Sequence, residues 1–168
     1  MQALKAATAV HHERLERRVD IASRVRSRDA YRELLERFYG FYRPLEERLQ
    51  PYGETVELRP KAPLLARDVQ SLGGDVNALP QASRLPPTGS LAEALGVLYV
   101  LEGATLGGAV IAKLAQRRLG VTREQGGAFF GAYDARRWKA FKLVVERHGA
   151  ADAAAVATFE DMEEWVCT

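Results

Sequence analysis

Four polar residues near the N-terminus have the spacing needed to share one side of a helix. They are Lys5, Thr8, His12 and Glu16, three or four positions apart in "LKAATAVHHERLE", and residues at this spacing are neighbours on a helix surface. A carboxylate at Glu16 could accept the proton of one imidazole nitrogen of His12 and leave the other nitrogen free to bind a metal. Lys5 could meet an anionic group of a ligand. The same spacing also fits an ordinary surface pair, which contributes only about a few tenths of a kcal/mol.

The apolar pattern of this segment favours the neighbouring histidine for burial. Its apolar centre consists of Leu4, Ala7, His11 and Leu15, which places His12 on the flank. A helix that lies between a core and a ligand can use both positions, so the spacing leaves open which histidine would bind a metal. The histidines show no zinc-type spacing with cysteine or with a second histidine.

Three glycines interrupt the most apolar part of the chain. Gly103, Gly107 and Gly108 lie in "LYVLEGATLGGA", residues 98–109, although each glycine inside a helix costs about 1 kcal/mol relative to alanine. Gly103 and Gly107 are one turn apart, so they clear a single face that something large and flat could approach. Close packing of two helices accounts for the same residues. The cluster lacks the lysine and serine of a phosphate-binding loop and does not indicate nucleotide binding.

The elements that must position these residues are predicted to be helices, because the two-residue alternation of strands is absent. Ser90 and Glu93 form a capping box, S-x-x-E, at the start of the glycine-bearing helix, and Gly120 ends it. Pro44 should bend its helix or mark an irregularity. The sequence therefore predicts one all-α domain over residues 1–168. Helices are expected at about 2–19, 28–50, 61–72, 91–119, 135–149 and 152–166, with a turn-like element at 126–133.

Composition restricts the partners and the compartment. The chain has 168 residues, with 24 basic and 22 acidic side chains, and this weak bias does not indicate nucleic acid. Cys167 is the only cysteine, so no intrachain disulfide can form and a cytoplasmic location is expected. Residues 94–112 are almost continuously apolar, but a membrane span would place Glu102 near the bilayer centre at high cost. We therefore expect a buried helix and no membrane span.

The N-terminal and glycine-rich segments together resemble the biliverdin-producing heme oxygenases. The opening pattern T-x-x-x-H-x-x-L-E is matched by Thr8, His12, Leu15 and Glu16. "LYVLEGATLGG" resembles the distal helix of the bacterial branch, which includes the phytochrome-associated type. "FFGAYD" and "RWKAF" resemble its later segment. The resemblance covers nearly the whole chain in the right order. It implies a multi-helical heme oxygenase-like fold, with heme between a proximal N-terminal helix and a kinked, glycine-rich distal helix.

The resemblance assigns roles on the proximal side of the heme. His12 would be the ligand to the heme iron, and Glu16 would pair with its imidazole. Thr8 belongs to the same motif. Lys5 matches a basic position that meets a heme propionate in some members. Further propionate partners could come from Arg137, Lys139 or Lys142, among which spacing does not choose.

On the distal side, the resemblance places Gly103 and Gly107 against the porphyrin, and Gly108 would help the kink. One residue departs from the family pattern. Animal-type members carry an aspartate directly after the first glycine and the bacterial branch usually carries a serine, whereas this chain has Ala104. The polar group that would help to deliver protons is therefore missing.

The activity implied by the resemblance is oxidative cleavage of heme b, as both substrate and cofactor, to biliverdin, carbon monoxide and ferrous iron. It would need O2 and an external electron donor, such as a reductase or a ferredoxin, and biliverdin could be passed to a bacteriophytochrome. Ala104 motivates an alternative, a non-enzymatic heme carrier or sensor that keeps the fold. A third and weaker hypothesis is a related helical fold with a different small-molecule ligand.

Overall fold

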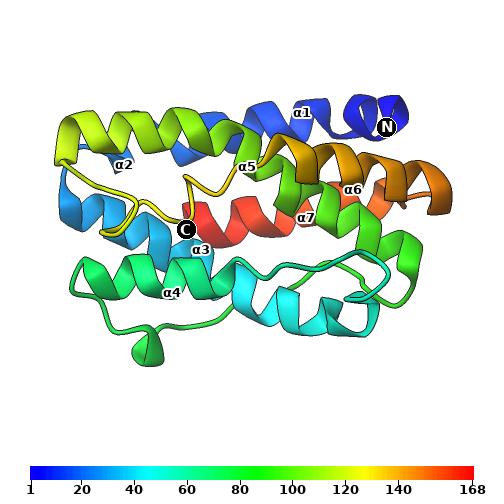
Figure 1. Cartoon of the computed structure of the whole chain (residues 1–168), viewed down its shortest axis with the longest axis horizontal. Helices are drawn as coiled ribbons and strands as arrows, with labels where there is room; N and C mark the ends of the chain where they lie inside the picture. Colours follow the sequence, from blue (N-terminus) through cyan, green and yellow to red (C-terminus); the bar gives the residue numbers. More distant parts are fainter.

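The computed structural model describes all 168 residues, and its regular elements are all helical. The one β-type pairing is an isolated bridge between Thr122 and Gly126. The predicted all-α fold is thus confirmed. The elements in chain order are α1 (Gln2–Val19), α2 (Ile21–Arg24), α3 (Arg28–Leu49), η1 (Gln50–Tyr52), α4 (Ala62–Ser71), η2 (Val76–Ala78), α5 (Leu91–Leu119), α6 (Ala135–His148) and α7 (Asp152–Cys167) (Figure 1).

Short-range hydrogen bonds explain why the helices begin and end close to the predicted positions. The Ser90 hydroxyl accepts the backbone N–H of Glu93 at 3.2 Å, as in a capping box. The carboxylate of Asp134 accepts the N–H groups of Arg136 and Arg137 at the start of α6. Gly120 ends α5 in the left-handed conformation, with a φ of 64°, which glycine adopts without steric cost.

Helix α3 passes through Pro44 because the missing hydrogen bond is replaced. Proline has no N–H, so the carbonyl four residues earlier, that of Gly40, loses its helical partner. The N–H of Ala82 donates to this carbonyl at 2.9 Å. The expected irregularity at Pro44 therefore serves as an attachment point for the loop that precedes α5.

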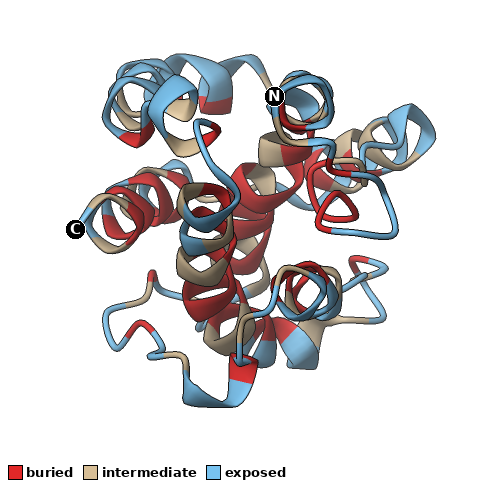
Figure 2. Cartoon of the chain, turned by 90° about the vertical axis from the view of Figure 1, so that its left-hand side faces the viewer, coloured by how far each residue is buried: buried red, intermediate tan, exposed pale blue.

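The core lies along α3, α5 and α7, and 35 buried apolar residues form one continuous cluster from Leu4 to Val166. Figure 2 shows this burial concentrated on the helices in the middle of the molecule. Helix α3 buries 11 of its 22 residues. Helix α1 buries only Leu4, Thr8 and Val19 of its 18 residues. The helix that carries His12 is therefore attached to the core by a narrow strip.

Helices α1 and α5 both pack against α7 but make no extensive contact with each other, whereas α6 packs against α5. Figure 1 shows the later half of α5 and helix α1 along the same side of the molecule. The axis of α5 changes direction near its middle, where the three glycines lie (Figure 1). This bend agrees with the kink expected there, although the helix is continuous from Leu91 to Leu119.

Helix α5 is the one helix that is long and apolar enough to cross a membrane by length and composition. However, 56% of its most apolar window is buried inside the protein. The core helix of a globular domain meets the same criteria, and the burial of α5 against α7 identifies it as that kind of helix.

Candidate functional site

His12 offers an accessible imidazole on α1. Its side chain is 55% exposed, and its Nε2 atom lies 3.6 Å from Oε1 of Glu16, which is too far for a hydrogen bond. The ring meets Phe159 of α7 edge-on, with the ring centroids 5.7 Å apart. Phe159 thus holds one side of the imidazole, and both nitrogens remain free of hydrogen bonds to the protein.

His11 also lies against α7 and is less exposed than His12. Its side chain is 22% exposed, and its Nδ1 atom lies 3.7 Å from Oε1 of Glu160. This nitrogen is buried and has no hydrogen-bond partner. The prediction that His11 is the more buried of the two histidines is confirmed, and His12 is the one that a ligand can reach without displacing α7.

The other polar residues of the α1 motif differ in what they can contact. Thr8 is buried, and its hydroxyl donates to the carbonyl of Leu4 at 2.7 Å, so it helps to pack the helix. Lys5 is exposed and forms no ion pair. Glu16 is also exposed, beside His12. The structure therefore brings Lys5, His12 and Glu16 together on the accessible part of α1, with Thr8 beneath them.

The glycines of α5 occupy two different environments. A methyl group placed on Gly107 would meet no other atom within 4 Å, and one placed on Gly103 would reach only the edge of Trp138, at 4.0 Å. Gly96 lies seven residues before Gly103, on the same side of the helix, and there α7 fills the space. Packing between helices therefore explains Gly96 but explains neither Gly103 nor Gly107.

The face that Gly103 and Gly107 clear is apolar and partly exposed. Leu106 and Val110 lie on it and are 41% and 71% exposed. These two exposed aliphatic side chains and the two glycines form an apolar strip along the helix. At the two glycines only the helix backbone is present, with the aliphatic side chains of Leu106 and Val110 beside it. This surface leaves room for a flat apolar ligand.

Gly108 has a structural reason of its own. A methyl group there would lie 2.8 Å from the carbonyl oxygen of Phe130, which is too close for any real side chain. The segment that carries Phe130 is fixed from the other side, because the buried carboxylate of Asp68 accepts the N–H groups of Ala128 and Phe129 at 2.9 and 2.8 Å. Burial raises the pKa of Asp68. The close-packing explanation therefore holds for Gly108.

A buried charged cluster lies directly beside the first of these glycines. Oε1 of Glu102 is 2.8 Å from Nζ of Lys61 and 3.2 Å from Nη2 of Arg137. The side chains of Glu102 and Lys61 are 9% and 8% exposed. Sequence reasoning did not find this cluster. The signal for it was the single acidic residue within the apolar run of α5, since a buried carboxylate needs a partner.

Among the three basic residues considered as propionate partners, only Arg137 is engaged by the protein. Its guanidinium donates to Glu102. Lys139 is exposed, Lys142 is half-buried, and neither forms an ion pair. All three lie on α6, which packs against α5.

No group of three or more histidine, cysteine, aspartate or glutamate side chains is placed to hold a bare metal ion. A metal bound through His12 would therefore need most of its ligands from elsewhere. A porphyrin would itself supply four nitrogen ligands, so that His12 alone could hold its iron on the protein. The donor set around His12 fits iron in a macrocycle and does not fit a free ion.

Comparisons with known proteins show the family to which the chain is similar. A family profile described as heme oxygenase matches residues 1–163. A curated heme oxygenase from Xanthomonas campestris pv. campestris is 32% identical over 143 residues, covering 80% of this chain and 84% of its own length.

Two solved bacterial heme oxygenases share the fold. The enzyme from Neisseria meningitidis, solved with NO and CO bound, has a TM-score of 0.77 at 20% identity and covers 98% of this chain and 85% of its own. The enzyme from Leptospira interrogans has a TM-score of 0.75 at 17% identity, covering 99% of this chain and 97% of its own.

Proposed function

This chain belongs to the heme oxygenase family and is a heme-degrading oxidoreductase, and from this premise we propose that it binds heme between α1 and α5 with His12 as the iron ligand. Oxidative cleavage of the macrocycle would release biliverdin, carbon monoxide and ferrous iron. The family membership does not favour the alternative of a carrier or sensor.

The observation that carries the proposed site is the open space at Gly107. A glycine in a helix is costly by about 1 kcal/mol, and nothing in the protein uses the space that this glycine leaves. The cost is therefore offset by something outside the chain. The exposed apolar face around Gly107 indicates that this is a flat, apolar molecule.

When bound, heme supplies the iron at which O2 is activated, and the residues of this chain bind, orient and shield it. On the α1 side, His12 would coordinate through one ring nitrogen, and Glu16 would accept a hydrogen bond from the N–H of the other after a small movement from 3.6 Å. On the α5 side, Leu106 and Val110 would exclude water from the ring, and the backbone at Gly103 and Gly107 would leave room at its face.

Proton supply on the distal side depends on solvent in this proposal. Ala104 has no polar group, and the hydroxyl of the neighbouring Thr105 donates to the carbonyl of Glu102 at 2.6 Å. The carboxylate of Glu102 is held by Lys61 and Arg137. With these groups engaged, water beside the exposed positions of α5 is the proton source.

The propionates of the heme would be met by free lysines. Lys5 on α1 and Lys139 or Lys142 on α6 have no ion-pair partners in the protein. Arg137 is the weakest candidate of the set, because a propionate would have to compete with Glu102 for its guanidinium.

The reaction also needs partners that supply electrons and accept the product. We propose a reductase or ferredoxin as the electron donor, with a bacteriophytochrome as one possible acceptor of biliverdin. The lone Cys167 fits a reducing compartment, and we propose that this is the cytoplasm.

The test is to reconstitute the full chain with hemin, supply a ferredoxin–reductase system and O2 with catalase present, and identify the products. Catalase removes free hydrogen peroxide, which degrades heme without enzymatic control. Biliverdin by mass spectrometry, with carbon monoxide and ferrous iron in equal amounts, is the expected result. A heme complex that survives the reductant and O2 unchanged would instead identify a carrier.

A further inference from the structure

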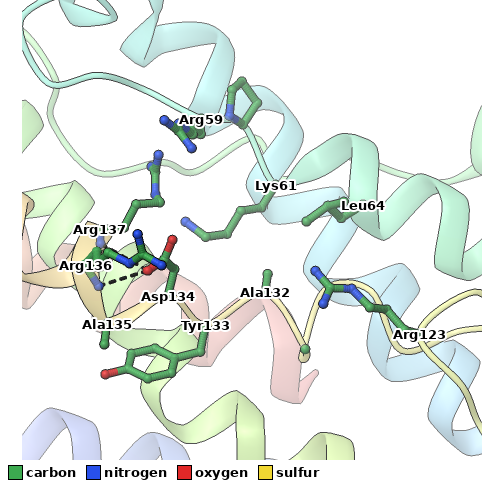
Figure 3. Close-up of a pocket in the computed structure, with 12 residues that line it drawn as sticks. Arg59, Lys61, Leu64, Arg123, Ala132, Tyr133, Asp134, Ala135, Arg136 and Arg137 are labelled. Carbon is green, nitrogen blue, oxygen red and sulfur yellow. Dashed lines mark hydrogen bonds between the residues drawn. The ribbon is translucent and has the colours of Figure 1, made fainter.

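A basic cavity of about 590 Å³ lies between the start of α4 and the start of α6. Five of its lining residues are cations, and one carboxylate, Asp134, is among them. In Figure 3 the side chain of Lys61, the residue before α4, extends towards the residues that begin α6, and Arg123 approaches from the segment that precedes α6. The cations are Arg59, Lys61, Arg123, Arg136 and Arg137.

These charges are only partly balanced by carboxylates of the protein. Arg59, Arg123 and Arg136 form no ion pair, and Lys61 and Arg137 share one oxygen of Glu102. The chain as a whole has nearly equal numbers of basic and acidic residues, so this excess is local. Five cations around one cavity repel each other, and Lys61 does so from a buried position where water screens little.

The backbone does not create this site. The N-terminus of α4 is already capped, because the Glu46 carboxylate accepts the N–H groups of Lys61 and Ala62 at 2.7 and 3.0 Å. Asp134 caps α6 in the same way. The excess charge is therefore carried by side chains, and Arg59, Arg123 and Arg136 have no carboxylate partner.

We propose that this cavity binds a small, multiply charged oxyanion, either an organic phosphate or a polycarboxylate. Arginine forks pair with both groups through two parallel hydrogen bonds, and the volume lies in the range of small-molecule sites. Heme is not its occupant, because only four of the 12 lining residues are apolar.

Binding here acts on the helix that carries the glycines. Lys61 and Arg137 hold Glu102, and Glu102 directly precedes Gly103. An anion that draws these two cations towards the cavity weakens their hold on Glu102. Occupancy of the cavity is therefore expected to change the ion pairs of Glu102.

Isothermal titration of the heme-free chain with pyrophosphate and, separately, with citrate tests the proposal. We expect saturable 1:1 binding of at least one anion with a Kd below about 1 mM at low salt. Binding of pyrophosphate alone identifies a phosphoryl ligand, and binding of citrate alone identifies a carboxylate ligand. This readout does not depend on the proposed heme chemistry, since no heme is present.

Variants decide whether the bound anion occupies this cavity. The double variant R59Q/R123Q should weaken binding by about tenfold or more, and it removes no ion pair from the folded protein. Arg147 is exposed and forms no ion pair, and it lies at the opposite end of α6 from the cavity, so R147Q is the matched control and should leave the Kd unchanged. Saturable binding of neither anion, an unchanged Kd in R59Q/R123Q, or an equal loss in R147Q would overturn the proposal. An acidic partner protein that binds where both small anions fail would replace it.

Discussion

Gly108 lies against Phe130 so closely that a methyl group in its place would be 2.8 Å from the Phe130 carbonyl oxygen. Replacement by alanine is expected to destabilise the protein. Overpacking against a fixed backbone costs about 2 kcal/mol, which exceeds the gain of about 1 kcal/mol in helix propensity. Urea unfolding of heme-free G108A should show a lower free energy of unfolding, and an unchanged value would mean that the Phe130 segment moves freely.

Replacing Gly107, one residue earlier, is expected to stabilise the heme-free protein instead. Gly107→Ala fills empty space, so it should stabilise the heme-free protein by up to about 1 kcal/mol. The same methyl group would occupy the proposed heme surface and should weaken hemin binding and slow turnover. Urea unfolding with and without hemin measures both effects, and G108A is the matched control. Stabilisation without any loss of hemin affinity would remove Gly107 from the site.

The two histidines are expected to differ in their effect on the iron. His12→Ala should abolish the histidine-ligated spectrum of the ferric heme complex, and added imidazole should restore it. His11→Ala should leave the spectrum largely intact, because His11 faces Glu160 on α7. Absorption and resonance Raman spectra of both variants with hemin provide the measurement. Loss of the spectrum in H11A alone would reverse the assignment.

Replacing only one residue of the Lys61–Glu102 ion pair should lower the free energy of unfolding. Lys61→Met leaves the buried carboxylate of Glu102 with only Arg137, and removal of one partner of a buried pair costs about 3 kcal/mol. Chemical unfolding of K61M and of K61M/E102Q gives the comparison. The double variant should recover part of the loss, since it buries no unpaired charge. If both variants are equally unstable, packing rather than charge explains the effect.

Attachment of α1 to α7 should depend on pH through Glu163. Burial alone would raise the pKa of Glu163, but hydrogen bonds from Arg18 and Arg14 outweigh it and lower the pKa. A carboxylate whose pKa is lower in the folded state stabilises the fold above its unfolded value, and this contribution disappears as the pH falls through the folded value. Glu163→Gln should therefore reduce stability at pH 7, and the difference from the parent should close below about pH 4.

Urea unfolding at several pH values measures this difference. Glu146→Gln, an exposed and unpaired position on α6, is the control and should show no such trend. A difference for E163Q that stays constant down to low pH would contradict the assignment to charge.

Local features of the fold could be predicted well, because short-range hydrogen bonds determine them. The bounds of α1 and the caps at Ser90, Gly120 and Asp134 depend on neighbours within four residues. Thr122 shows the limit of such signals. Its hydroxyl accepts the N–H of Gln125 as in a helix cap, but the cap closes a turn and no helix follows.

The site could be predicted only in part, because its distinctions arise from distant segments. Gly107 and Gly108 are the same residue type, and only the approach of Phe130 separates a glycine required by packing from one that leaves open space. Glu102 meets Lys61, 41 residues away in the sequence, and no local pattern indicates that pairing. The roles of His12 and Gly103 in heme binding remain predictions.

The narrow attachment of α1 affects the order in which parts of the molecule open. With three of 18 residues buried, α1 buries less apolar surface than α3, so we expect α1 to separate from α7 more readily than α3 unfolds, once the ion pairs of Arg14 and Arg18 with Glu163 are broken. Admission of a rigid planar molecule then needs only a local fluctuation of one helix, while the rest of the core stays folded. A molecule coordinated on α1 and packed on α5 would join the two helices and close this low-energy route. When the planar ring is cut, this link between α1 and α5 would be lost, and α1 could separate from the core again. The cleavage reaction would therefore determine when the product can leave.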